Sequence, residues 1–100
     1  MTAAAGAHRP WKVERDLPII NEKGLHARAS ARFVEIVEAH DAEAEVERDG
    51  QIVPGDSIMG LLTLGAAKGC GIRLRTRGPA ATELADALTR LVSDRFGEPF

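Results

Sequence analysis

In GLHARAS, residues 24–30, the hydrophobic pattern of the chain changes from that of a strand to that of a helix. Before it, apolar residues alternate with others over residues 12–20, which predicts a strand, and Pro18 favours an edge position for that strand. After it, apolar side chains recur at helical spacing over residues 27–39, which predicts an amphipathic helix. His26 therefore lies in a turn, directly before the first residue of a helix.

The rest of the chain continues this mixture of strands and helices. Strands are expected at residues 42–47, 51–53 and 72–77, and helices at residues 58–64 and 81–96. Asp49-Gly50 is a strong signal for a two-residue hairpin between the first two of these strands. The order β-α-β-β-α-β-α predicts an α+β domain in which helices pack on one face of an antiparallel or mixed sheet.

Length and composition limit the class of protein. The chain has 100 residues, 44% hydrophobic and 28% charged, which is typical of one small globular domain. Its net charge of -2 argues against a general nucleic-acid binder and against a polybasic membrane binder. Residues 1–10 are small and polar, so we expect a disordered tail rather than a secretory signal. Because Cys70 is the only cysteine and no apolar stretch is long enough to span a membrane, we expect a soluble cytoplasmic protein.

His26 lies at the expected start of a helix, a position that suits a histidine that accepts a phosphoryl group. The first N–H groups of a helix are free and lie at the positive end of its dipole, which disfavours a protonated imidazole and leaves a neutral nucleophile. After transfer, the same N–H groups and Arg28 would stabilise the phosphoryl charge. From these residues alone, a turn or capping histidine without chemistry is the commoner alternative.

Several kinds of site are missing from the sequence. It holds no Gly-rich phosphate loop with its lysine, so we do not expect ATP to be the phosphoryl donor. It has no paired acidic cluster for Mg²⁺, and no histidine has another His or Cys three or four residues away, so we expect no metal and no cofactor. A phosphoryl group on His26 would then come from another protein.

Residues 56–60, DSIMG, form the second candidate site. Ser57 is open to three interpretations: a phosphorylation site at a helix start, a plain N-cap, or the attachment serine of an acyl carrier. Acyl carriers resemble acidic all-helical bundles, and the expected strands argue against that third interpretation. The helix after Ser57 carries more apolar residues than one face of a short helix needs: Ile58, Met59, Leu61 and Leu62. Either some of them are exposed and form a docking patch, or both sides of the helix are buried, and the sequence favours neither interpretation.

Two rows of charge occupy strand faces. Arginines stand at 73, 75 and 77, and glutamates at 43, 45 and 47. The arginines alone would suggest RNA binding, but pairing between neighbouring strands would neutralise both rows and is the favoured interpretation. His40 is expected to cap the end of its helix, and Cys70 is expected to be a turn residue rather than a nucleophile.

Together, Gly24-Leu25-His26-Ala27-Arg28 and Ser57-Ile58-Met59-Gly60-Leu61 resemble the HPr family, the histidine phosphocarriers of the phosphoenolpyruvate-dependent phosphotransferase system. Both motifs stand at the family's spacing, and the resemblance runs from about residue 13 to residue 98. It implies an open-faced β-sandwich over residues 11–98, in which a four-stranded antiparallel sheet has three helices on one face.

The resemblance also implies a function. Enzyme I would phosphorylate Nδ1 of His26 with a group from phosphoenolpyruvate, Arg28 would assist, and a IIA-type domain would receive the group. The chain would be a phosphoryl carrier and no enzyme by itself, and a monomer is the simplest state. Ser57 matches the position modified by HPr kinase/phosphorylase. The docking surface would be formed by Leu25, Ala27, Ile58, Met59, Leu61 and Leu62.

The resemblance leaves one alternative function open, and the sequence departs from the family pattern at one position. The alternative is a mainly regulatory binding module controlled at Ser57, or a member of a nitrogen-type phosphotransferase chain. The departure is Ala29, which stands where most relatives carry proline. Alanine favours the first turn of a helix, so we expect the helix to form, with an altered orientation of His26.

Overall fold

A computed structural model describes residues 10–100, and the tail expected at residues 1–10 lies outside this range apart from Pro10. In these residues, strands and helices follow the expected order. The elements are β1 (Val13–Pro18), α2 (Ala27–Glu38), β2 (Glu43–Arg48), β3 (Gln51–Pro54), α3 (Ile58–Thr63), β4 (Gly71–Arg77), α4 (Ala81–Ser93) and the 3₁₀ turn η1 (Arg95–Gly97).

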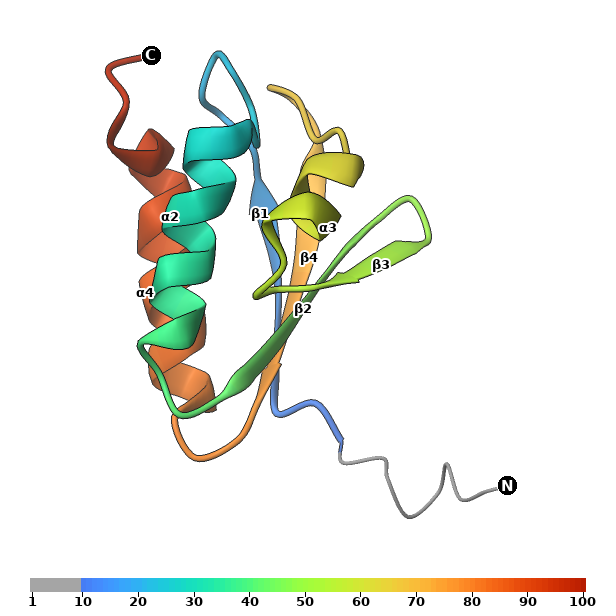
Figure 1. Ribbon diagram of the computed structural model, residues 1–100, viewed down its shortest axis with the longest axis vertical. Coiled ribbons are helices and arrows are strands. Elements are labelled where there is room, and N and C mark those ends of the chain that lie inside the picture. The colour runs from blue at the N-terminus through green and yellow to red at the C-terminus, as the bar shows by residue number, and fades with distance from the viewer. Residues whose placement is uncertain (1–9) are drawn as a thin grey trace.

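The four strands form one antiparallel sheet in the order β1-β4-β2-β3, with the helices on one face (Figure 1). This confirms the predicted α+β fold class. β1 is an edge strand, as Pro18 predicted, because proline has no N–H to donate to a second neighbour. The sheet also excludes the all-helical bundle that the acyl-carrier interpretation required.

The hairpin between β2 and β3 forms at Asp49-Gly50. Both residues have positive φ angles, 51° and 82°, as a two-residue turn of this kind requires. The turn pairs Arg48 with Gln51 and sets the register of the two strands.

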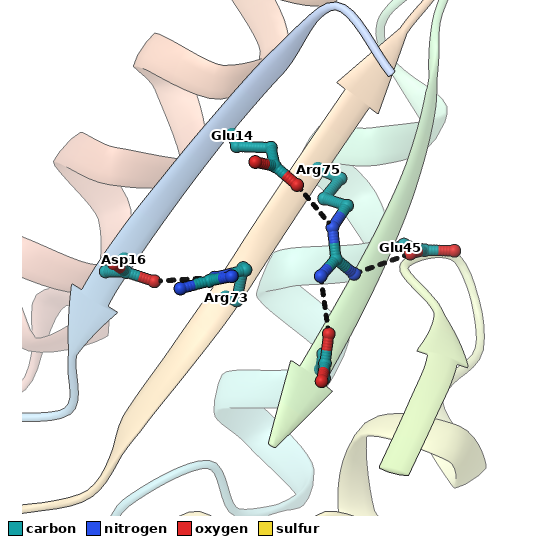
Figure 2. A network of polar contacts seen from close by, with 6 residues as sticks. Glu14, Asp16, Glu45, Arg73 and Arg75 are labelled. Atoms are coloured by element: carbon teal, nitrogen blue, oxygen red, sulfur yellow. Dashed lines mark hydrogen bonds and ion pairs between the residues drawn. The ribbon is translucent and has the colours of Figure 1, made fainter. Parts of the chain in front are cut away.

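The charge rows are paired across strands, as the alternation predicted. Glu43, Glu45 and Glu47 of β2 stand opposite Arg77, Arg75 and Arg73 of β4. Figure 2 shows the guanidinium of Arg75 between Glu14 and Glu45, at 2.6 and 2.7 Å, and it also reaches Glu47 at 2.5 Å. The arginine row is therefore bound to carboxylates, which removes the reason to connect it with RNA.

The core lies between the inner face of the sheet and the helices. Val46, Leu74 and Ile72 of the sheet and Phe33 of α2 are almost completely buried there. α4 covers β1 and β4, while α2 lies between α3 and α4. This packing brings the start of α2, the C-terminal segment and the loop before β4 to one end of the molecule (Figure 1).

Candidate functional site

His26 is the N-cap residue of α2. Its backbone is extended, with φ -79° and ψ -178°, and its side chain makes no capping hydrogen bond. The first helical bond runs from the Ser30 N–H to the His26 carbonyl oxygen at 2.8 Å. No capping side chain therefore occupies the N–H groups of the first turn, residues 27–29. Ala29 is fully buried in a regular helix, so the expectation that the helix forms without proline is confirmed.

The turn before His26 is fixed by close packing. Gly24 has φ +65°, and a Cβ atom there would lie 2.5 Å from the carbonyl oxygen of Ala66. Glycine is thus required by both conformation and space. The next residue, Leu25, donates its N–H to the same carbonyl at 2.9 Å and buries its side chain. These contacts hold the backbone at His26 in place.

The His26 ring lines a hollow of about 870 Å³. The other residues that line it are Glu22, Lys23, Ala27, Arg28, Glu98, Pro99 and Phe100. The side chain of His26 is 27% exposed, and Arg28 is exposed beside it. Arg28 has no hydrogen bond or ion pair among residues 10–100, so its guanidinium is available to an anion placed at the hollow.

Glu98 is a site residue that the sequence analysis missed. Its Oε2 contacts Nε2 of His26, and its Oε1 accepts a hydrogen bond from Nδ2 of Asn21 at 3.0 Å. Burial alone would raise the pKa of Glu98, but the hydrogen bonds from His26 and Asn21 outweigh it and lower that pKa. Glu98 is therefore a carboxylate near neutral pH. It stands 72 residues from His26 in the chain, so no local motif signals the contact.

Ser57 is the N-cap of α3, and its Oγ accepts a hydrogen bond from the Gly60 N–H at 2.9 Å. This confirms the capping interpretation, which is compatible with a second role as a modification site. His40 likewise confirms its expected part, because its Nδ1 lies 2.8 Å from the carbonyl oxygen of Ile36 near the end of α2. Cys70 lies at the end of a turn, where its sulfur accepts a hydrogen bond from Arg48 at 3.2 Å.

The predicted docking residues separate into two groups. Ile58 and Met59 are 39% and 70% exposed, Ala27 is exposed and Leu62 is half-buried. The prediction was wrong for Leu25 and Leu61, which are 5% and 0% exposed. Their side chains belong to the hydrophobic core, because α3 and the turn before α2 direct them toward it. Neither can contact a partner without local unfolding.

The part of the chain that the structure describes holds neither a metal-ligand cluster nor a membrane-spanning helix. No three His, Cys, Asp or Glu side chains in residues 10–100 come together as metal ligands would. None of the described helices combines the length and apolar character needed to cross a membrane.

Comparisons with known proteins match most of the chain. The family model described as "PTS HPr component phosphorylation site" matches residues 13–94. The phosphocarrier protein HPr of Cupriavidus necator is 42% identical over 86 residues, which are 86% of this chain and 97% of that protein. A crystal structure of HPr from Thermoanaerobacter tengcongensis has a TM-score of 0.85 at 35% identity, and covers 89% of this chain and 100% of its own. A second structure from that organism, of an HPr dimer, has a TM-score of 0.69 at 33% identity, with 91% and 100% covered.

Proposed function

Since the chain belongs to the HPr family of phosphocarrier proteins, we propose that it accepts a phosphoryl group on His26 from an enzyme I and passes it to a IIA-type domain. The original source of the group is phosphoenolpyruvate, through the donor protein. The chain acts in the cytoplasm as a carrier between two proteins, and the group is held by a side chain rather than by a cofactor.

The observation that carries this proposal is the position of His26 at an uncapped helix start. Its ring faces an open hollow, the N–H groups of the first turn of α2 have no capping side chain, and Arg28 is exposed beside it. Free N–H groups and a guanidinium are the donors that a phosphoryl dianion requires. Because the hollow is formed by one chain, transfer by a monomer is the simplest form of the proposal, and light scattering during size-exclusion chromatography tests it.

The test follows the group through both transfers. The purified chain is incubated with phosphoenolpyruvate and a bacterial enzyme I, and a IIA domain is then added. We expect the chain to gain one phosphoryl group and to lose it to the IIA domain. His26→Ala should abolish both transfers, whereas His40→Ala, which removes a histidine outside the hollow, should leave both intact. Transfer that persists in His26→Ala would contradict His26 as the acceptor, whereas a wild type that gains no phosphoryl group but is still modified at Ser57 would favour the regulatory module, in which His26 is secondary.

A second role is favoured by the position of Ser57. We propose that HPr kinase/phosphorylase modifies Ser57 and thereby slows transfer to His26. Ser57 lies directly before Ile58 and Met59, the exposed apolar residues of the expected docking surface. A phosphate there adds about two negative charges. If the docking face of enzyme I is acidic, these charges oppose its approach.

Ser57→Asp and Ser57→Asn separate charge from capping. Asp and Asn are both good N-cap residues, so α3 should remain intact in either variant. Only the first adds a negative charge. We expect slower phosphorylation of His26 in Ser57→Asp than in Ser57→Asn, measured as the initial rate with limiting enzyme I. Equal rates in the two variants, and in the serine-phosphorylated protein, would contradict the regulatory proposal.

A further inference from the structure

Glu98 contacts the His26 ring through a carboxylate that is held at both oxygens. Oε2 meets Nε2 of His26, while Oε1 accepts from Nδ2 of Asn21 at 3.0 Å. The same nitrogen, Nδ2, also donates to the Gly24 carbonyl oxygen at 2.9 Å. Asn21 is fully buried, and the opposite orientation of its amide would set Oδ1 against two acceptors. The orientation of Asn21 is thereby fixed, and with it the position of Glu98.

This arrangement leaves one polar atom without a partner. Oδ1 of Asn21 is buried and has no hydrogen bond among the described residues. A buried acceptor without a partner destabilises the folded protein. The Asn21 amide therefore holds the Gly24 turn and the Glu98 carboxylate through its nitrogen, while its oxygen makes no hydrogen bond.

The backbone on both sides of Glu98 is also anchored. Phe96, two residues before it, is fully buried, and the Glu98 N–H donates to the Arg95 carbonyl oxygen at 2.9 Å. Beyond it, the carbonyl oxygen of Phe100 accepts from the Glu22 N–H at 3.1 Å. Glu98 is thus held against His26 by its own segment, and its side chain is only 20% exposed.

An ionised carboxylate accepts hydrogen bonds and donates none, so the nitrogen that faces it must carry the proton. The contact with Glu98 therefore places the proton of a neutral His26 on Nε2 and the lone pair on Nδ1. Among residues 10–100, no hydrogen bond engages Nδ1. The nitrogen left free to react is the one on the opposite side of the ring from Glu98.

We propose that Glu98 is a positioning residue for phosphoryl transfer. It fixes the Nε2–H tautomer of His26, so that Nδ1 is the acceptor, and it stabilises the positive charge of the ring while the phosphoryl group is attached. This inference rests on the proposed carrier function, and it adds the group that selects the reacting nitrogen.

The transfer step needs no proton movement at His26. The Nδ1 lone pair attacks phosphorus of the phosphorylated donor protein, the Nδ1–P bond forms, and the bond from phosphorus to the donor breaks with its electron pair left on the donor. The ring becomes a phosphorylated imidazolium, whose positive charge faces the Glu98 carboxylate. In the onward transfer a nucleophile of the acceptor protein forms a bond to phosphorus as the N–P bond breaks, the electron pair of that bond returns to Nδ1, and the ring leaves as neutral imidazole with the proton still on Nε2.

Other charges face the same hollow. Lys23 interacts electrostatically with Glu98, and Arg28 lines the hollow beside the ring. Glu22 also lines it, but its carboxylate pairs with Lys68 at 3.2 Å. Glu22→Gln is therefore the matched control, because it removes one carboxylate from the hollow without touching His26.

The first experiment measures the tautomer without any donor protein. Long-range ¹H–¹⁵N NMR of the unphosphorylated protein at mildly alkaline pH reports which ring nitrogen of His26 carries the proton. We expect one tautomer, Nε2–H, in the wild type and in Glu22→Gln, and a mixture of both in Glu98→Ala. The same tautomer populations in all three proteins would overturn the proposal.

The second experiment identifies the reacting nitrogen and the rate. Phosphoramidate, a small phosphoryl donor to imidazoles, should give the Nδ1 isomer in the wild type and both isomers in Glu98→Ala, read from ³¹P NMR. With enzyme I, Glu98→Gln should lower the transfer rate roughly ten- to a hundredfold and change its pH profile, as loss of a charged hydrogen bond predicts. An Nε2 product in the wild type, or a rate unchanged in Glu98→Gln, would overturn the proposal. A wild type that enzyme I does not phosphorylate would count against the carrier function alone, because the NMR results need no enzyme I.

Discussion

Single side chains around His26 differ in what they offer a phosphoryl group. Arg28 is exposed and has no ion pair among the described residues, whereas Glu22, which also lines the hollow, is paired with Lys68. A guanidinium that stays free in the unloaded carrier loses no existing contact when it turns toward a phosphoryl oxygen. Arg28 should therefore stabilise the phosphorylated form of the protein and contribute little to the free energy of unfolding.

Arg28→Ala tests this difference. We expect the variant to accept the phosphoryl group from enzyme I about ten- to a hundredfold more slowly, since a charge-assisted hydrogen bond contributes about 1.5–3 kcal/mol. Its free energy of unfolding in urea should stay within about 0.5 kcal/mol of the wild type, as for other exposed substitutions. Arg90→Ala is the control, because Arg90 is exposed on α4 and does not line the hollow. A normal rate in Arg28→Ala would remove Arg28 from the site.

At the scale of elements, the C-terminal segment completes a site that begins at the start of α2. η1 buries Phe96 and turns the chain so that Glu98 meets His26 and Asn21. Arg95, Phe96 and Gly97 all have positive φ angles, which is uncommon for the first two. The segment therefore takes a conformation set by tertiary contacts rather than by local preference.

The pH dependence of stability should report the Glu98 contact. The folded protein holds the pKa of Glu98 below its ordinary value of 4.5, because hydrogen bonds from His26 and Asn21 outweigh the opposing effect of burial. A depressed folded pKa adds stability that is fully present above the unfolded pKa and is lost as the pH falls through the folded one. We expect the wild type to lose more free energy of unfolding than Glu98→Gln as the pH drops below about 4.5. Parallel urea-unfolding curves at every pH would contradict this.

The same elements show which parts of the fold and of the site could be predicted from the sequence. Alternation located β1, β2 and β4, and Asp49-Gly50 located the hairpin and with it β3, because these signals involve residues close together in the chain. The matched charges of β2 and β4 even indicated which strands are neighbours. Glu98 was not predicted as a site residue, because it follows the last helix without any periodic pattern and contacts a residue 72 positions away in the chain. Leu25 and Leu61 were misjudged because short apolar segments do not show which face is buried.

At the scale of the whole molecule, the inner face of the sheet supports the helices and the outer face carries a network of charges. The inner face packs against the helices, whose ends carry His26 and Ser57. The outer face carries the charge network in which Arg75 binds Glu14, Glu45 and Glu47 and thus joins β1, β4 and β2 (Figure 2). Hydrogen bonds to Glu47 and Glu14 raise the pKa of Arg75, so its charge is permanent.

Substitution of Arg75 should show the strength of that network. Arg75→Ala leaves three carboxylates close together, and its side chain is only 14% exposed, so we expect a loss of about 1–3 kcal/mol in the free energy of unfolding. Arg73→Ala removes an arginine that is 50% exposed and pairs with Asp16 alone, so we expect a smaller loss in the free energy of unfolding. Urea unfolding at low and high salt measures both, and the cost of Arg75→Ala should fall less with salt. Equal costs would show that the network adds nothing beyond single surface pairs.

The carrier function itself depends on one event, the attachment of a phosphoryl group to His26. Intact mass spectrometry after incubation with phosphoenolpyruvate and enzyme I, before and after mild acid, measures this event most directly. We expect a gain of one phosphoryl group in the wild type that acid removes, and no gain in His26→Ala. A group that survives acid, or an equal gain in His26→Ala, would contradict it.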